Sequence, residues 1–234
     1  MKNKAIEQLE ITRYQEGKLY QTKDKVVVEK ETSFYIEDKK ITLHHMPSLE
    51  LELAIGHAIT EAYIKAPEIY ATAKPKLHVS KTPNPTYTKI TNPASCTPKH
   101  ANIHPSIALQ LVQQLEKQAK IHQQTGGTHI VGLATLQGQL LYTVEDISRH
   151  CALDKVVGIA ALNNIQLCDK ILVLSSRITY TIIKKIINTK IPIAVTKAAT
   201  TTKAIQHAKK HNLTLIAFTR KNRLNIYSQP NTVE

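Results

Sequence analysis

The chain has no tryptophan, two phenylalanines and seven glycines among its 234 residues. A core without large aromatic rings must be built from Ile, Leu, Val and Ala, and the 42% apolar content is sufficient for a folded α/β or α+β protein. No apolar run reaches the length of a membrane span, and residues 1–7 lack the apolar segment of a secretory signal. We therefore expect a cytoplasmic protein with no membrane partner.

Cysteine is also scarce, with three residues that lie far apart in the sequence. An odd, widely spaced set argues against a disulfide framework and for a reducing compartment. The chain contains neither a C-x-x-C nor an H-x-E pattern, so the signature of zinc deaminases is missing. We predict no metal site.

Acidic residues are the minority: 18 Asp and Glu stand against 31 Lys and Arg, which gives a formal net charge of +13. This balance favours anionic partners such as nucleic acids, nucleotides, phosphate-bearing cofactors or acidic proteins. The lysines are dispersed, aromatic residues rarely lie between them, and no nucleic-acid-binding module is recognisable. Nonspecific nucleic-acid binding is therefore the weakest alternative, and we expect no nucleic-acid partner.

The first part of the chain is predicted to be rich in strands. Residues 1–46 contain short β-prone runs at 25–28, 33–36 and 40–43. A helix is expected to begin at Ser48, because Ser can cap a helix and acidic residues follow in the first turn. Residues 74–93 hold four prolines and are predicted to be extended, irregular chain between two parts of the molecule.

The second part alternates between strands and helices, which predicts a largely parallel sheet covered on both faces. A hairpin is expected at Gln137-Gly138. The predicted helices cover residues 106–120, 151–164, 178–187 and 200–210, and the predicted strands cover 130–136, 139–143, 170–174, 191–195, 213–218 and 224–227.

The stretch from Val144 to Gly158 concentrates polar chemistry between a predicted strand and a predicted helix. It reads V-E-D-I-S-R-H-C-A-L-D-K-V-V-G. Open α/β sheets bind ligands at such junctions, because helix N-termini and strand ends converge there. The alternative interpretation is a capped helix start with solvated charges.

Cys96 is the strongest candidate for a reactive residue. Prolines and small polar residues place it on a loop, and the neighbouring Lys99 and His100 are expected to lower its thiol pKa. An exposed thiolate on a loop suits the transfer of sulfur between partners. The alternative is an adventitious surface cysteine, while Cys151 and Cys168 are expected to pack against helix or strand neighbours.

Two further segments could contact phosphate. Gly126-Gly127 is a turn that could admit a phosphate close to the backbone, although such pairs are more often plain turns. Residues 218–223 combine one aromatic ring with three cations after a strand, so that the ring could stack on a base while the cations meet phosphates. The alternative for this segment is a solvated basic turn.

Together, these motifs resemble the formate dehydrogenase accessory sulfurtransferase family (FdhD/NarQ), in the same order and over most of the chain. The matching segments are T-G-G-T-H at 125–129, the stretch at 145–158, which corresponds to E-D-I-G-R-H-N-A-x-D-K-V-I-G, S-S-R at 175–177 for S-G-R, A-A-T at 198–200 for A-P-T, F-T-R-K-N-R at 218–223 for F-x-R-x-x-R, and N-I-Y at 225–227 for N-x-Y. A motif as long as the second is highly specific.

The resemblance implies an α/β fold in three parts. A small, β-rich N-terminal α+β domain would cover residues 1–90, and a loop or linker with the cysteine would cover 91–103. Residues 104–234 would form a three-layer α/β/α, cytidine deaminase-like domain without the zinc. We also expect a homodimer.

The resemblance further implies a sulfur carrier required for formate dehydrogenase activity. Sulfur would pass from a cysteine desulfurase, as a persulfide on Cys96, to the molybdenum (or tungsten) bis-molybdopterin guanine dinucleotide cofactor before its insertion into formate dehydrogenase. The residues expected to bind this cofactor are Gly126, Gly127, His129, Asp146, Arg149, His150, Asp154, Lys155, Phe218, Thr219, Arg220, Lys221, Asn222 and Arg223.

One departure concerns the cysteine loop, which reads Cys96-Thr97-Pro98-Lys99 where the family has two cysteines. A persulfide carrier needs only one attacking thiol, so transfer by Cys96 alone is chemically sensible. No second thiol on this loop can resolve the persulfide as a disulfide. The alternative function is a chaperone that binds the cofactor or a guanine nucleotide without transferring sulfur.

Overall fold

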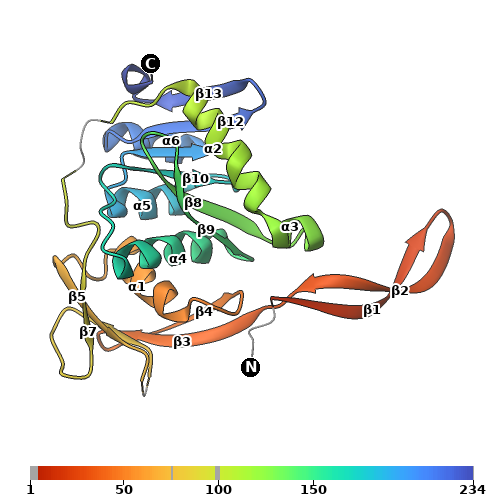
Figure 1. Cartoon of the computed structure of the whole chain (residues 1–234), viewed down its shortest axis with the longest axis horizontal. Coiled ribbons are helices and arrows are strands. Elements are labelled where there is room, and N and C mark those ends of the chain that lie inside the picture. Colours follow the sequence, from red (N-terminus) through yellow and green to blue (C-terminus); the bar gives the residue numbers. More distant parts are fainter. Residues whose placement is uncertain (1–4, 75, 98–100, 234) are drawn as a thin grey trace.

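A computed structural model describes residues 5–74, 76–97 and 101–233 of the chain (Figure 1). Two sheets and a long two-stranded ribbon account for the described strands. The elements are β1 (Ile6–Gln15), β2 (Lys18–Val27), β3 (Lys30–Ile36), β4 (Lys39–His45), α1 (Glu50–Thr60), β5 (Glu68–Thr72), β6 (His78–Ser80), β7 (Thr88–Thr91), α2 (Pro105–Gln118), α3 (Lys120–Thr125), β8 (His129–Thr135), β9 (Leu140–Asp146), α4 (Arg149–Leu162), β10 (Lys170–Leu174), α5 (Tyr180–Thr189), β11 (Ile193–Thr196), α6 (Thr202–Lys210), β12 (Thr214–Arg220), β13 (Arg223–Ser228) and the 3₁₀ turn Pro230–Thr232.

The larger sheet has six strands in the order β13-β12-β11-β10-β8-β9. Only β10, β11 and β12 run parallel; β8, β9 and β13 pair antiparallel to their neighbours. The prediction of a largely parallel sheet is therefore wrong. The reason is that tight turns at Gly138 (φ +85°) and Lys221 (φ +49°) return the chain directly beside the preceding strand.

Helices cover both faces of this sheet. On one face, Leu111 and Leu115 of α2 pack in a core cluster with Ile130, Ile171 and Val173 of the strands. On the other face, α4, α5 and α6 contribute to a second, larger cluster. Helices on both faces agree with the sequence prediction, while the likeness to cytidine deaminases stays a prediction. None of the described helices is long and apolar enough to cross a membrane.

The smaller sheet has the order β4-β3-β6-β5-β7 and packs against α1. β6 and β7 fall in the proline-rich stretch 74–93, so the prediction of irregular chain there is wrong for these residues. Both strands are short: β6 pairs with the neighbouring β5 and with the distant β3, and β7 returns to pair with the other edge of β5, which the local pattern does not reveal. The predicted cap of α1 is also wrong, because Leu49 takes the cap position and no side chain caps the helix.

Helix α1 joins the smaller sheet to the larger one. It crosses α4 with Gly56 and Gly158 at the contact, where the two backbones touch. One core cluster contains buried side chains from the smaller sheet, from α1 and α4, and from the larger sheet. The proposed boundaries at residues 90 and 104 stay a prediction.

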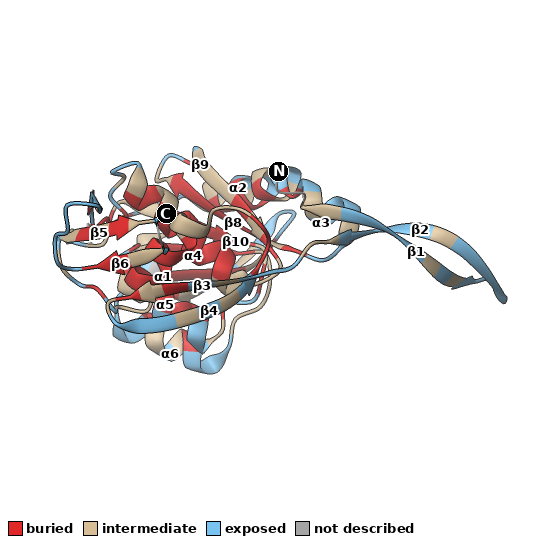
Figure 2. Cartoon of the chain, turned by 90° about the horizontal axis from the view of Figure 1, so that it is seen from below, coloured by how far each residue is buried: buried red, intermediate tan, exposed pale blue. Residues whose placement is uncertain are grey.

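The ribbon formed by β1 and β2 extends away from the body (Figures 1 and 2). Its two strands pair in full register over ten residues each and are almost entirely exposed. At its base, Lys25 donates a hydrogen bond to Gln124 (3.0 Å), and Val27 packs against Gly127. The sequence predicted a strand only at residues 25–28 of this ribbon.

Candidate functional site

A cavity of about 490 Å³ opens where β10 and β11 end and β8 begins. A smaller cavity of about 340 Å³ adjoins it and shares Glu116, Lys197 and Arg220 with it. We refer to the two together as the strand-end cavity. Its remaining polar lining side chains are Gln113, His122, Gln123, Thr128, His129, Ser175, Thr219 and Lys221.

Backbone geometry places Ser175 and Lys197 at the rim of the sheet. Ser175 follows β10, and its hydroxyl accepts a hydrogen bond from the Ile130 amide (3.0 Å). The Lys197 amide donates to the Leu174 carbonyl (3.1 Å), which carries the parallel pairing one residue beyond β11. The two side chains therefore sit on neighbouring strand ends, where open α/β sheets bind ligands.

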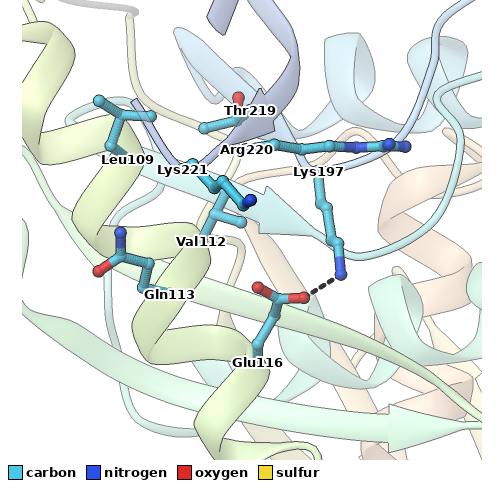
Figure 3. Close-up of a pocket in the computed structure, with 8 residues that line it drawn as sticks. All are labelled: Leu109, Val112, Gln113, Glu116, Lys197, Thr219, Arg220 and Lys221. Atoms are coloured by element: carbon cyan, nitrogen blue, oxygen red, sulfur yellow. Dashed lines mark hydrogen bonds and ion pairs between the residues drawn. The ribbon is translucent and has the colours of Figure 1, made fainter. Parts of the chain in front are cut away.

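A β-bulge near the end of β12 orients the basic segment. The register of β12 against β13 breaks between Ala217 and Arg220, and Phe218 adopts a positive φ of 52°. The Phe218 amide donates to the Ala198 carbonyl (2.9 Å). As a result Thr219 is buried while Arg220 and Lys221 line the cavity (Figure 3).

Glu145 positions the residues on the opposite side of the cavity. Its carboxylate accepts hydrogen bonds from the amides of Ile121 (2.8 Å) and His122 (2.7 Å) at the start of α3, and from the Thr128 hydroxyl (2.8 Å). The His122 ring lies 2.6 Å from the Thr128 carbonyl oxygen through Nδ1. The acid at the start of the long motif thus positions two lining residues without itself lining the cavity.

The strand-end cavity carries a strong excess of positive charge. Lys197, Arg220 and Lys221 line it, and its one lining carboxylate, Glu116, pairs with Lys197 (Figure 3). Burial and the charges of Arg149, His122 and Arg177 lower the pKa of His129, so its ring is neutral at neutral pH. Such a lining suits a ligand with several phosphates.

Three buried polar atoms at this end of the sheet have no hydrogen-bond partner. They are Arg149 Nε, Ser176 Oγ and Thr219 Oγ1, and they are the complete set of such side-chain atoms among the residues that the structure describes. Arg149 begins α4 after β9, Ser176 follows β10, and Thr219 lies at the end of β12. Buried polar groups are normally satisfied, so each of these atoms is open to a further hydrogen bond. Of the three residues, Thr219 lines the strand-end cavity, whereas Arg149 and Ser176 lie outside its lining.

Two of the predicted cofactor-binding residues form a buried ion pair. The Lys155 ammonium lies 2.7 Å from Asp146 and donates to the Met46 carbonyl (2.9 Å), and both side chains are at most 1% exposed. Asp146 also accepts from the Ser148 amide (3.0 Å). The pair fastens the segment before α1 to the start of α4 and adds no surface to the cavity.

Asp154 occupies a second buried cluster, between α1, α4 and α5. Its carboxylate contacts Lys185 (2.8 Å), His57 (2.8 Å) and the Thr60 hydroxyl (2.6 Å). Burial opposes its ionisation, but Lys185 and His57 outweigh that effect and lower the pKa of Asp154. Its role in cofactor binding stays a prediction, and its position indicates packing of three helices.

The remaining predicted residues lie at the edges of the site or away from it. Gly126 ends α3 at a positive φ of 66°, and Gly127 packs against Val27 of the ribbon. The His150 ring contacts the Thr181 hydroxyl (3.0 Å), and burial, Lys185 and Arg149 lower its pKa. Asn222 and Arg223 are exposed in the β12–β13 turn outside both cavities. Their predicted roles stay predictions.

Cys96 forms a disulfide with Cys168, with a Cα–Cα separation of 6.1 Å. Cys168 is buried among its neighbours as expected, but its pairing with Cys96 was not predicted, because the argument against a disulfide framework did not anticipate a single distant pair. Sequence spacing misled because the pair is 72 residues apart and meets only in the folded chain. Lys99 and His100, which were expected to lower the Cys96 pKa, lie outside the described residues. Burial raises the pKa of the free Cys151 thiol to about 12.

The disulfide and the strand-end cavity lie at opposite ends of β10. Cys168 stands two residues before this strand and Ser175 directly after it. Five residues of strand span about 17 Å. The structure therefore brings His129, Thr219, Arg220 and Lys221 together in the strand-end cavity. Cys96 lies at the opposite end of the strands.

Sequence reasoning did not single out Lys197, His122 or Glu116 as site residues. Lys197 carried a usable signal, because it follows a buried strand just as Ser175 does. His122 and Glu116 lie on α3 and α2, and only the packing of these helices beside the strand ends brings them to the cavity.

The chain is similar in sequence to a known protein family and to individual proteins of that family. The model of the FdhD/NarQ family matches residues 79–234. "Protein FdhD" of Methanocaldococcus jannaschii is 32% identical over 95% of this chain and 96% of its own length. "Sulfur carrier protein FdhD" of Sulfolobus acidocaldarius is 28% identical over 98% of this chain and 99% of its own.

A solved structure shows the same fold. It is that of a candidate formate dehydrogenase accessory protein from Desulfotalea psychrophila, with a TM-score of 0.82, 19% identity, and coverage of 99% of this chain and 100% of that one. Family model, full-length relatives and fold agree with the motifs and the arrangement of the strand ends. The chain belongs to the FdhD/NarQ family.

Proposed function

We propose that this protein is a sulfur carrier for formate dehydrogenase, that Cys96 accepts sulfur from a cysteine desulfurase as a persulfide, and that the recipient is the molybdenum (or tungsten) bis-molybdopterin guanine dinucleotide cofactor. Two full-length relatives are named sulfur carrier proteins. The cofactor is the cargo of this reaction, and its phosphates and guanine rings are the groups that the protein would recognise.

One observation carries the binding half of the proposal: the strand-end cavity combines Lys197, Arg220 and Lys221 with the unpartnered Thr219 hydroxyl. Cations and a free hydroxyl are the groups that bind phosphate oxygens. Phe218 precedes Thr219 and Arg220 at the bulge and is partly buried, but it does not line either cavity, so stacking of its ring on a base stays a prediction. In this proposal His129, at the start of β8, completes the wall, and the charge of Arg149 acts on it from nearby.

The first experiment measures binding of GDP, which stands for the guanosine diphosphate half of the cofactor, by isothermal titration calorimetry. Because a hydrogen bond to a charged group contributes about 1.5–3 kcal/mol, Arg220→Ala should raise the dissociation constant by about tenfold or more. The matched control is Lys209→Ala, which removes an equal charge from the exposed face of α6. Equal affinities of wild type and Arg220→Ala would refute the assignment of the cavity.

The second experiment tests the transfer half. Wild type and Cys96→Ala are incubated with a cysteine desulfurase and cysteine and analysed by intact-protein mass spectrometry. A gain of one sulfur atom by reduced wild type early in the reaction, reversed by reductant and missing in Cys96→Ala, supports the persulfide. If GDP binds in the cavity but no sulfur is transferred, the protein is a cofactor or nucleotide chaperone without sulfur transfer.

A further inference from the structure

Cys168 is the partner of Cys96 in the structure, although the loop motif itself holds no second cysteine. We propose that Cys168 is the resolving thiol of the Cys96 persulfide, so that sulfur leaves this protein as hydrosulfide. This inference rests on the proposed function, because it presupposes that Cys96 receives sulfur. It gives a role to a residue that the family motifs leave aside.

The fold holds the two cysteines together from both sides. The Leu167 amide, next to Cys168, donates to the Pro93 carbonyl (3.2 Å), and the Cys96 sulfur lies 3.4 Å from the same oxygen. The Asn92 side chain donates to the Ala66 carbonyl (2.9 Å) and accepts from the Ala94 amide (3.0 Å). The Leu167 bond holds the segment before Cys96 against the turn before β10, and the Asn92 bonds hold it against the chain before β5, independently of the disulfide itself.

The two sulfur atoms differ in accessibility in the way that such a pair requires. Cys168 is 2% exposed, whereas Cys96 is partly exposed. A donor protein can therefore reach Cys96 but not Cys168. A carrier thiol must be accessible to its donor, while a resolving thiol needs to reach only the carrier.

The chemistry balances with these two residues and one external reductant. The Cys168 thiolate attacks the sulfur atom that is bonded to the Cys96 β-carbon. The Cys96–Cys168 bond forms, the bond to the outer sulfur breaks, and that sulfur leaves as hydrosulfide with the bonding electron pair, while the Cys168 proton passes to solvent. The two cysteines are oxidised by two electrons and the transferred sulfur is reduced to sulfide. A dithiol reductant of the thioredoxin type then restores both thiols.

Release as hydrosulfide also agrees with the position of the pair. Cys96 is fastened at one end of β10 and the strand-end cavity lies at the other end, about 17 Å of strand away. A sulfur atom that stays bound to Cys96 in this arrangement does not reach the cavity. A small hydrosulfide ion can move between the two places.

The test is a single-turnover experiment on three proteins: wild type, Cys168→Ser and Cys151→Ser. Each is reduced, freed of reductant without oxygen, and mixed with cysteine desulfurase that carries a persulfide and has been separated from cysteine. Intact mass, free sulfide and the Cys96–Cys168 disulfide peptide are measured over time. Cys151→Ser is the matched control, because it removes a buried thiol that is not part of the pair.

We expect Cys168→Ser to retain the additional sulfur on Cys96 and to release little sulfide. Wild type and Cys151→Ser should lose the additional sulfur, release one sulfide per chain and acquire the disulfide, which a wild-type sample without donor should lack. The last comparison needs no variant and so is independent of any folding defect in Cys168→Ser.

Retention of the persulfide by wild type for as long as by Cys168→Ser, without sulfide or disulfide, would overturn the role of Cys168 and leave the proposed function intact. If neither wild type nor Cys168→Ser takes up sulfur or releases sulfide, the proposed function itself fails. A disulfide that forms equally with and without donor would also overturn the proposal, since it would result from oxidation alone.

Discussion

The contact between α1 and α4 gives a sharp prediction about stability. A methyl group added to Gly158 would lie 1.9 Å from the Glu52 carbonyl oxygen, and one added to Gly56 would lie 1.7 Å from that of Asp154. A methyl carbon is in ordinary van der Waals contact only from 3.4 Å, so Gly158→Ala should force the two helices apart by about 1.5 Å. The neighbouring atoms are backbone, which cannot turn aside as a flexible side chain would.

The expected magnitude follows from two opposed effects. Forcing extra volume into a packed core costs about 1–3 kcal/mol, and the backbone contact places this site near the upper limit. Replacing Gly by Ala within a helix stabilises it by about 1 kcal/mol. Gly158→Ala should therefore lower the free energy of unfolding by about 2 kcal/mol, which for a protein of this size corresponds to a decrease of about 4–8 °C in Tm.

Urea and thermal unfolding followed by circular dichroism measure this change. The double variant Gly56→Ala/Gly158→Ala should lose less than the sum of the single losses, because one separation of the helices relieves both clashes. The sign of the change in the free energy of unfolding distinguishes the two effects, because helix propensity alone predicts that Gly158→Ala is more stable than wild type. That result would refute the close backbone contact between α1 and α4.

Three further predictions concern charge, pH and the ribbon. Lys185→Met should destabilise the protein by about 3–5 kcal/mol, because it leaves Asp154 buried without its principal cation, while Lys184→Met on the exposed side of α5 should change urea unfolding little. Burial and the charge of Lys155 lower the pKa of His45. Below pH 6.5 the folded state therefore binds fewer protons than the unfolded state. The Tm should fall as the pH decreases from 6.5 and should stay level above pH 6.5. Removal of residues 7–26 should leave the urea midpoint of the body unchanged, since the ribbon is exposed over nearly its whole length, and a large decrease would show that it supports the core.

Much of the fold could be predicted where an element carries its own pattern. The strand at residues 170–174 coincides with β10, because a buried apolar run is bounded by polar residues on both sides. The ribbon escaped prediction because the apolar residues of its strands do not keep to alternate positions, so no single face marks a core. β6 and β7 escaped because they are short, lie among prolines, and are not joined only to their immediate neighbours: β6 also pairs with β3, and β7 pairs with β5.

The site was predictable to a similar degree. Arg220 and His129 were expected from motifs at strand ends, and both line the strand-end cavity. Asp146 and Lys155 come from the same long motif but are buried against each other, and nothing in their spacing distinguishes a ligand contact from an internal ion pair. The meeting of Cys96 with Cys168 depends on two turns of the folded chain, which no local pattern encodes.

The disulfide closes a loop of 72 residues, from the cysteine loop through α2, α3, β8, β9 and α4 to the start of β10. In the chain-entropy description, a cross-link of this length removes conformations from the unfolded ensemble and stabilises the native state by about 4 kcal/mol. That amount is a large fraction of the free energy of unfolding of a typical domain. Oxidation and reduction of this pair therefore set the thermodynamic stability of the molecule, and each cycle that makes and breaks the bond alternates the protein between a more stable and a less stable form.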